Sequence, residues 1–124
     1  MPPPGFVAHC LELLSPLGEA RARRMFGGHG LYVDDLFVAI VAGERLYLKA
    51  GAEAAQHFGA AGGEPFTYER DGRRAALGFW TPPAEAMESP ELMRPWARLA
   101  LQAALSARSA ALAKAPRRTR SARR

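Results

Sequence analysis

The sequence has only one cysteine, Cys10, among its 124 residues, which excludes a disulfide within the chain and is typical of a reducing compartment. It contains no apolar run of about 18 residues, the length that a membrane-spanning helix requires. Its first six residues, MPPPGF, lack the basic stretch and the long apolar segment of a signal peptide. These absences predict a soluble, cytoplasmic domain without a membrane partner.

The common catalytic and metal-binding motifs are also missing. The three histidines and the single cysteine show neither C-x-x-C nor H-x-x-x-H spacing, and no G-x-S-x-G or H-E-x-x-H sequence occurs. His9 and Cys10 are adjacent on an expected helix, where neighbouring side chains point about 100° apart and cannot form a catalytic pair. The sequence therefore predicts no enzyme, no metal site and no cofactor.

Acidic residues are absent from residues 114–124, KAPRRTRSARR, although the chain has 12 acidic and 17 basic side chains. Six of the basic residues lie in this segment: Lys114, Arg117, Arg118, Arg120, Arg123 and Arg124. The preceding 113 residues hold the other 11 basic and all 12 acidic side chains, a net charge of −1. We expect a disordered tail, which is either an arm that contacts nucleic-acid phosphates without sequence preference or a solvated extension.

The hydrophobic pattern of residues 1–113 predicts one α+β domain, with an antiparallel sheet of about five strands and flanking helices in the order α-β-β-β-α-β-β-α. The expected elements are a helix within 6–17, strands at about 29–33, 36–42 and 45–50, a short helix over 52–58, a hairpin around Asp71-Gly72, and a last helix from Ser89 to about Ala113. The charged residues 19–24 are expected to lead into a glycine loop. Pro95 is expected to kink the last helix or to restart it.

Three glycines surround a histidine in the segment RRMFGGHGLYVDD, residues 23–35. A phosphate-binding loop would follow a strand and precede a helix, whereas here a helix is expected before the glycines and a strand after them. We therefore favour a structural interpretation, in which Met25 and Phe26 anchor the segment in the core. Gly27 and Gly28 then adopt positive φ angles or allow a close approach of the backbone to another element.

Two functional roles remain open for this segment. Its exposed side is a candidate docking surface, which would include residues 27–32 and draws on Arg24, Met25, Phe26, Gly27, Gly28, His29, Gly30 and Tyr32. Alternatively, three residues line a pocket for a small ligand or a substrate: His29, Tyr47 and Lys49. Tyr47 and Lys49 lie on one face of an expected strand. A deep pocket with converging polar groups would favour this second role.

Several large side chains are expected to pack in the core rather than to bind a ligand. Cys10 lies on the apolar stripe of the first helix and is expected to be an inert, buried thiol. Trp80 and Trp96 are expected to pack as well. The apolar stripe of the last helix is expected to consist of Leu92, Trp96, Leu99 and Ala103.

Four short motifs in the same order resemble the N-terminal domain of the TfoX/Sxy family of competence regulators. They are Arg24-Met25-Phe26-Gly27-Gly28, Leu46-Tyr47-Leu48-Lys49, Phe66-Thr67-Tyr68 and Trp96-Ala97. The resemblance runs from about Phe6 to Ala104. It implies a small α+β domain with an antiparallel sheet flanked by helices, and it implies no catalytic residues.

The resemblance also implies a non-enzymatic regulatory or adaptor function. The family's namesakes regulate competence genes and are thought to work with the cyclic-AMP receptor protein, so a transcription factor of this kind is the expected protein partner. The namesakes carry a separate C-terminal domain, whereas this sequence continues into residues 114–124 and is expected to be a stand-alone member. A homodimer formed through a sheet edge or through the last helix is the third alternative.

Overall fold

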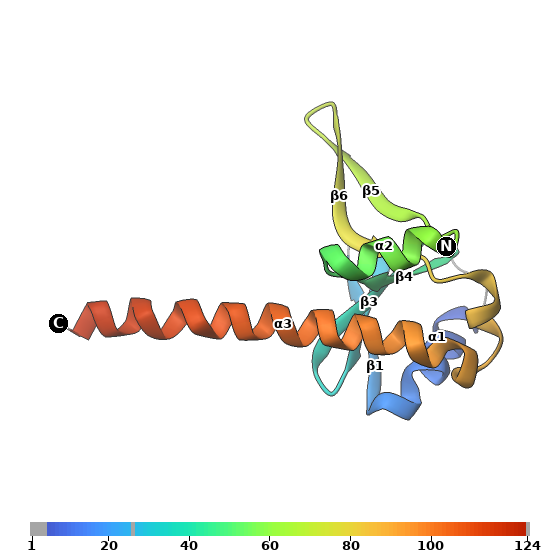
Figure 1. Ribbon diagram of the computed structural model, residues 1–124, viewed down its shortest axis with the longest axis horizontal. Coiled ribbons are helices and arrows are strands. Elements are labelled where there is room, and N and C mark those ends of the chain that lie inside the picture. Colours follow the sequence, from blue (N-terminus) through green and yellow to red (C-terminus); the bar gives the residue numbers. More distant parts are fainter. Residues whose placement is uncertain (1–4, 26, 124) are drawn as a thin grey trace.

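The computed structural model in Figure 1 describes residues 5–25 and 27–123, and it describes side chains throughout these ranges except at 68–70, 74–77 and 113–123. Within these residues a six-stranded antiparallel sheet has the strand order β1-β2-β3-β4-β6-β5. The elements are α1 (Phe6–Leu14), η1 (Ser15–Leu17), β1 (Ala20–Met25), β2 (Gly28–Val33), β3 (Leu36–Ala42), β4 (Arg45–Lys49), α2 (Ala52–Ala60), β5 (Pro65–Arg70), β6 (Arg73–Trp80), η2 (Ala84–Glu88) and α3 (Pro90–Arg123). The predicted α+β class with an antiparallel sheet is confirmed.

The sheet has one strand more than the sequence predicted, because residues 20–25 form the edge strand β1. Ala20 and Ala22 pack against the core, while Arg21 and Arg23, which alternate with them, are exposed. This alternation is the period of a half-buried strand. Alanine carries little hydrophobic signal beside arginine, so the segment was wrongly expected to be a charged lead-in to a loop.

The last helix, α3, differs from the expectation in two ways. It is continuous through Pro95, which lies in its second turn, where the loss of one hydrogen bond to the carbonyl of Glu91 interrupts few intrahelical bonds. It also continues through residues 114–123, past the expected end near Ala113, and Figure 1 shows it extending far beyond the sheet. The division into a domain over 1–113 and a tail over 114–124 stays a prediction.

The start of α3 agrees with its sequence signal. The backbone N–H of Leu92 donates a hydrogen bond to the Ser89 hydroxyl oxygen at 3.2 Å, and Pro90 and Glu91 occupy the first turn. A capping serine followed by proline and an acidic residue satisfies the unpaired N–H groups and suits the helix dipole. This cap fixes where α3 begins above the sheet.

The hydrophobic core lies between one face of the sheet and the three helices. Its members from α3 are Met93, Ala97, Ala100 and Ala104, all buried. The expected stripe of Leu92, Trp96, Leu99 and Ala103 is therefore displaced by one position, and the Leu92 side chain is 45% exposed. The small alanines face the sheet because they allow α3 to approach it closely, while the larger Trp96 and Leu99 pack at the flanks of this contact.

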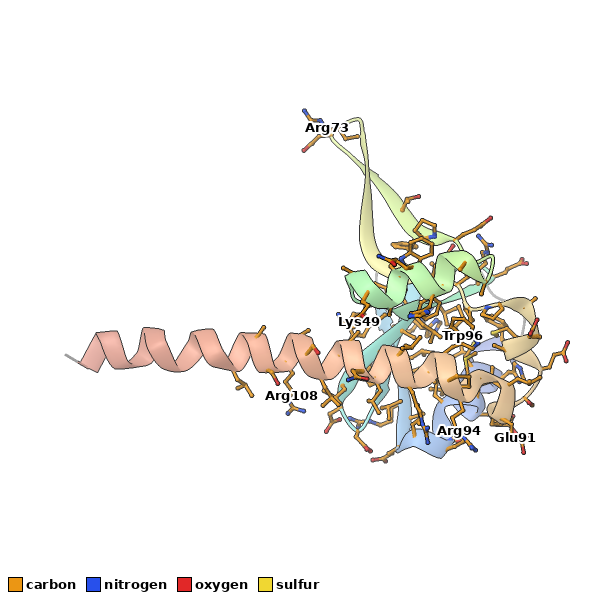
Figure 2. All side chains as sticks on the ribbon, viewed as in Figure 1. Lys49, Arg73, Glu91, Arg94, Trp96 and Arg108 are labelled. Atoms are coloured by element: carbon orange, nitrogen blue, oxygen red, sulfur yellow. The ribbon has the colours of Figure 1, made fainter. Side chains whose placement is uncertain are left out.

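The β5–β6 hairpin extends away from the body of the fold (Figure 1), and its Asp71-Gly72 turn has positive φ angles at both residues, as the sequence predicted. Arg73 lies at its tip, whereas Arg108 lies on the part of α3 that extends beyond the sheet (Figure 2). No helix within residues 5–25 and 27–123 is both long enough and apolar enough to cross a membrane.

Candidate functional site

The glycine-rich segment is a β-hairpin rather than a loop between a helix and a strand. Gly27 has a φ of +80°, which a residue with a side chain adopts only with strain. A side chain on Gly28 would collide with the carbonyl oxygen of Val41 on β3. A Cβ atom on Gly30 would lie 2.6 Å from the Met25 Cε atom. The structural interpretation of Gly27 and Gly28 therefore agrees with the structure, while Phe26 lies outside the described residues. The expectation that Met25 anchors the segment in the core is wrong, because strand alternation from Ala22 turns Met25 to the opposite face of the sheet, where a Cβ atom on Gly30 would meet both Met25 and Phe37.

The register of the sheet separates the residues that were grouped around a ligand. His29 pairs with Val41, and Val41 pairs with Leu46, so these three side chains share the face that carries the core. Tyr47 follows Leu46 directly, so Tyr47 and Lys49 lie on the opposite face. The expected patch of His29, Tyr47 and Lys49 does not form. The Nδ1 atom of His29 is buried without a hydrogen-bond partner among the described residues.

The sheet face opposite the core carries no helix among the described elements, and we call it the open face. Aromatic and basic side chains from five strands share this face by register or by ring contact: Arg21 and Arg23 of β1, Tyr32 of β2, Phe37 of β3, Arg45, Tyr47 and Lys49 of β4, and Phe79 of β6. Phe66 of β5 joins them through its contact with Tyr47. Of these residues, only Tyr47 and Lys49 could be placed together from the sequence, because strand pairing brings the others beside them.

The rings of the open face contact one another in a row across the sheet. The Tyr32 and Phe37 ring centroids are 5.2 Å apart, and those of Phe37 and Phe79 are 5.5 Å apart. The Lys49 ammonium nitrogen lies over this row, 5.2 Å from the Phe79 centroid and 5.9 Å from that of Phe37. The guanidinium carbon of Arg23 lies 6.0 Å from the Tyr32 centroid. Each cation is within the range of cation–π attraction.

A second aromatic pair lies farther along β4. Tyr47 and Phe66 meet edge to face with their centroids 5.0 Å apart, and Arg45 lies 5.9 Å from the Tyr47 centroid. Arg45 also forms an ion pair with Glu64 at 2.7 Å, and this carboxylate raises the pKa of the guanidinium further. Tyr47 is buried, so it supports this end of the open face rather than presenting a reactive hydroxyl group.

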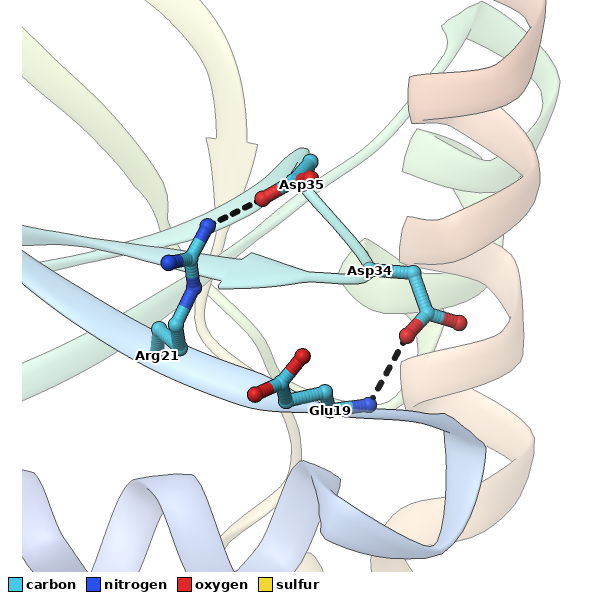
Figure 3. A network of polar contacts seen from close by, with 4 residues as sticks. All are labelled: Glu19, Arg21, Asp34 and Asp35. Atoms are coloured by element: carbon cyan, nitrogen blue, oxygen red, sulfur yellow. Dashed lines mark hydrogen bonds and ion pairs between the residues drawn. The ribbon is translucent and has the colours of Figure 1, made fainter.

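A polar network holds β1 to the turn between β2 and β3 (Figure 3). Asp34 and Asp35 form this two-residue turn with φ angles of 49° and 67°. The Glu19 backbone N–H donates to the Asp34 carboxylate at 2.9 Å, and the Asp34 N–H donates to the Glu19 carbonyl at 2.9 Å. Arg21 forms an ion pair with Asp35. These bonds help to hold two aspartates in left-handed backbone conformations that glycine would adopt without strain.

A hollow of about 430 Å³ opens at the β1 end of the open face. It is lined by Arg21, Ala22, Arg23, Tyr32 and Asp35. This volume lies at the lower end of the range of small-molecule sites. The hollow therefore combines one aromatic ring with two guanidinium groups and one carboxylate, a chemistry suited to a planar ring that carries an anionic group.

The remaining candidate residues have structural roles or fall outside the description. Cys10 is fully buried, and burial raises the pKa of its thiol to about 12, which agrees with an inert residue. Trp96 packs on Phe58 with ring centroids 5.1 Å apart, and Trp80 packs against the core, as predicted. The side chains of Lys114, Arg117, Arg118, Arg120 and Arg123, and the whole of Arg124, lie outside the described residues. In the described part of the chain, no group of three or more His, Cys, Asp or Glu residues could hold a metal ion.

The family model of the TfoX N-terminal domain matches residues 12–104, from within α1 to the last core residue of α3. The chain belongs to the TfoX N-terminal domain family. It is also 35% identical over 69 residues to Protein Sxy of Escherichia coli (strain K12), a match that covers 56% of this chain and 33% of that protein. The chain thus spans about a third of the length of the curated relative that it matches.

Proposed function

We propose that this TfoX N-terminal domain is a non-enzymatic regulatory domain that acts on competence-gene transcription by contacting a transcription factor, with the cyclic-AMP receptor protein as the expected partner. The observation that carries the proposal is the family match over residues 12–104, together with the similarity to Protein Sxy. DNA phosphates contacted by residues 114–124 would add affinity without adding sequence preference.

The arrangement of the motif residues supports a regulatory rather than a catalytic function. Gly27 and Gly28 serve the backbone of the β1–β2 hairpin, and His29 lies on the face of the sheet opposite Tyr47 and Lys49. An acid–base catalyst needs groups within hydrogen-bond reach of one substrate, which this separation prevents.

Binding to a receptor–promoter complex tests the proposal. The purified chain is titrated onto a fluorescent duplex that carries a receptor site, with the receptor protein and cyclic AMP present. We expect binding at least ten-fold tighter than to the same duplex without receptor, which is the control for DNA binding by the basic segment. Equal affinity with and without the receptor would contradict the proposed contact.

The docking segment has a matched pair of variants. Arg24 is exposed on β1, and Arg94 is exposed on α3, outside the docking segment. Arg24→Glu and Arg94→Glu change the net charge equally, so both weaken the DNA contribution to a similar extent. If the segment around Arg24 contacts the receptor, only Arg24→Glu should abolish the additional affinity that the receptor provides.

A homodimer is a second candidate, favoured by the exposed leucines of α3. The Leu105 and Leu112 side chains are 47% and 60% exposed on the part of this helix that extends beyond the core residues. Analytical ultracentrifugation of the full chain over a range of concentrations checks this candidate. A mass of one chain at all concentrations would exclude it.

A further inference from the structure

We propose that the open face of the sheet binds single-stranded DNA, with bases stacked on Tyr32 and Phe37 and with phosphates contacted by Arg23 and Lys49. This inference goes beyond the proposed function, which concerns a protein partner and duplex phosphates near residues 114–124. It depends on the contacts of the open face alone.

The architecture of the open face supports the stacking of bases. All three helices pack on the other side of the sheet, so aromatic side chains from neighbouring strands form a row without a helix over it. Tyr32 and Phe37 are half-buried, while Phe79 next to Phe37 in the row is buried. A sheet face with such aromatic residues is a common platform for stacking unpaired bases.

The cations of the open face support contact with a polyanion. Four cations of β1 and β4 lie on the open face among the described side chains, and two of them are neutralised: Arg21 by Asp35 and Arg45 by Glu64. Among the side chains that the structure describes, no carboxylate lies within 4.0 Å of Arg23 or Lys49. Both are placed over the aromatic row, so a polyanion could contact them while its bases contact the rings. A second copy of this face would instead bring like charges together.

The hollow beside Tyr32 also supports the binding of a base. Its volume of about 430 Å³ has room for a base on the ring, between Arg21 and Arg23. Arg23 is exposed, so its guanidinium can turn from the ring toward a phosphate when a base covers the ring. The hollow therefore provides a stacking surface and a phosphate contact at adjacent positions.

The same residues favour an unpaired strand of DNA over the alternatives. A duplex hides the faces of its bases, so that rings on a sheet cannot stack on them. Selecting RNA requires a group that recognises the 2′-hydroxyl. The carboxylate that lines the hollow, Asp35, is already paired with Arg21 and is not free to accept a hydrogen bond from that hydroxyl group. We therefore expect no preference for RNA.

Fluorescence anisotropy with the full chain and a labelled oligothymidine of about twelve nucleotides tests the proposal. The salt concentration is kept at about 200 mM to weaken phosphate contacts by the basic segment. We expect Tyr32→Ala to weaken binding at least five-fold, and Tyr32→Phe to bind like the parent, because a phenyl ring also stacks. The parent and both variants should bind a duplex with equal affinity, since the Tyr32 ring does not stack on paired bases.

Controls separate stacking from folding and from charge. Tyr32→Leu keeps an apolar side chain at this position and should bind as weakly as Tyr32→Ala, even if the alanine variant is less stable. Arg23→Glu should weaken binding more than Arg94→Glu, which makes the same change of charge on the helix side of the fold.

Three results would overturn the proposal. The first is parental affinity of both Tyr32→Ala and Tyr32→Leu for the oligothymidine. The second is binding to oligouridine at least ten-fold tighter than to oligothymidine. The third is failure of Tyr32→Leu to bind the receptor while the parent chain does not bind oligothymidine at all, because the open face would then be a protein-docking surface. Failure of DNA binding alone leaves the regulatory proposal intact.

Discussion

Gly28 lies so close to Val41 that a single added carbon at Gly28 would collide with the Val41 carbonyl oxygen. This close approach joins the β1–β2 hairpin to β3, and it explains a glycine whose φ angle is not in the left-handed region. The neighbouring Gly27 shows the other reason for a glycine, a φ of +80° with nothing within 4 Å of a Cβ atom.

The two glycines should respond differently to substitution. Gly27→Ala is expected to lower the unfolding free energy by about 1–2 kcal/mol, because alanine is strained in the left-handed backbone conformation of this position. Gly28→Ala should cost more, because the Val41 backbone must move. Urea unfolding measures both, with Gly51→Ala as the control, since Gly51 has open space and a φ of −76°. Parental stability of both variants would contradict the structural role of the motif.

The turn at Asp34 and Asp35 offers a stabilising substitution. Both residues have positive φ angles, and aspartate followed by glycine is a preferred sequence for such a turn. Asp35→Gly should raise the unfolding free energy by about 0.5 kcal/mol, because the exposed ion pair that it removes contributes little. Asp35→Ala loses the same ion pair but keeps the backbone strain, so thermal unfolding should show it below the parent. The reverse order of the two variants would contradict the turn geometry.

The buried thiol of Cys10 makes stability depend on pH in alkaline solution. Burial raises its pKa from 9.0 to about 12, so above pH 9 the unfolded chain loses this proton while the folded chain retains it. The folded state then loses up to about 1.4 kcal/mol per pH unit through this group. Below pH 9 both states hold the proton and the effect vanishes. Urea unfolding of the parent and Cys10→Ala from pH 8 to 10.5 should show the additional loss only in the parent.

Reactivity of the same residue gives a second check. A thiol reagent should modify the native protein far more slowly than the unfolded protein, because Cys10 is fully buried. Equal rates in the two states would contradict its burial.

Removing residues 114–124 should abolish most of the affinity for duplex DNA. The remaining chain carries a net charge of −1, whereas the removed segment carries six cations. If all six contact phosphates, the logarithm of affinity should fall with the logarithm of salt concentration at a slope of about −5. A salt titration of both chains on a random duplex measures this slope. Equal affinity of the two chains would assign DNA binding to the folded domain.

The sequence alone was sufficient for the fold class, for most element boundaries and for the cap of α3, because those depend on local patterns. An unbroken apolar run identified β3, the alternation of apolar residues identified β4, and Ser89-Pro90-Glu91 marked the start of α3. The motifs also indicated the family. Edge strand β1 was missed because its inward residues are alanines, whose burial depends on what packs against them rather than on their hydrophobicity.

Only the tertiary structure decided which side chains meet. Tyr32, Phe37, Lys49 and Phe79 lie on four different strands, and strand pairing places them in one row. The same register places His29 on the other face, which separates it from Tyr47 and Lys49. A shift of one residue in strand pairing moves a side chain to the opposite face. Local sequence patterns do not contain that register, because it is set by long-range packing of the sheet against α1 and α3.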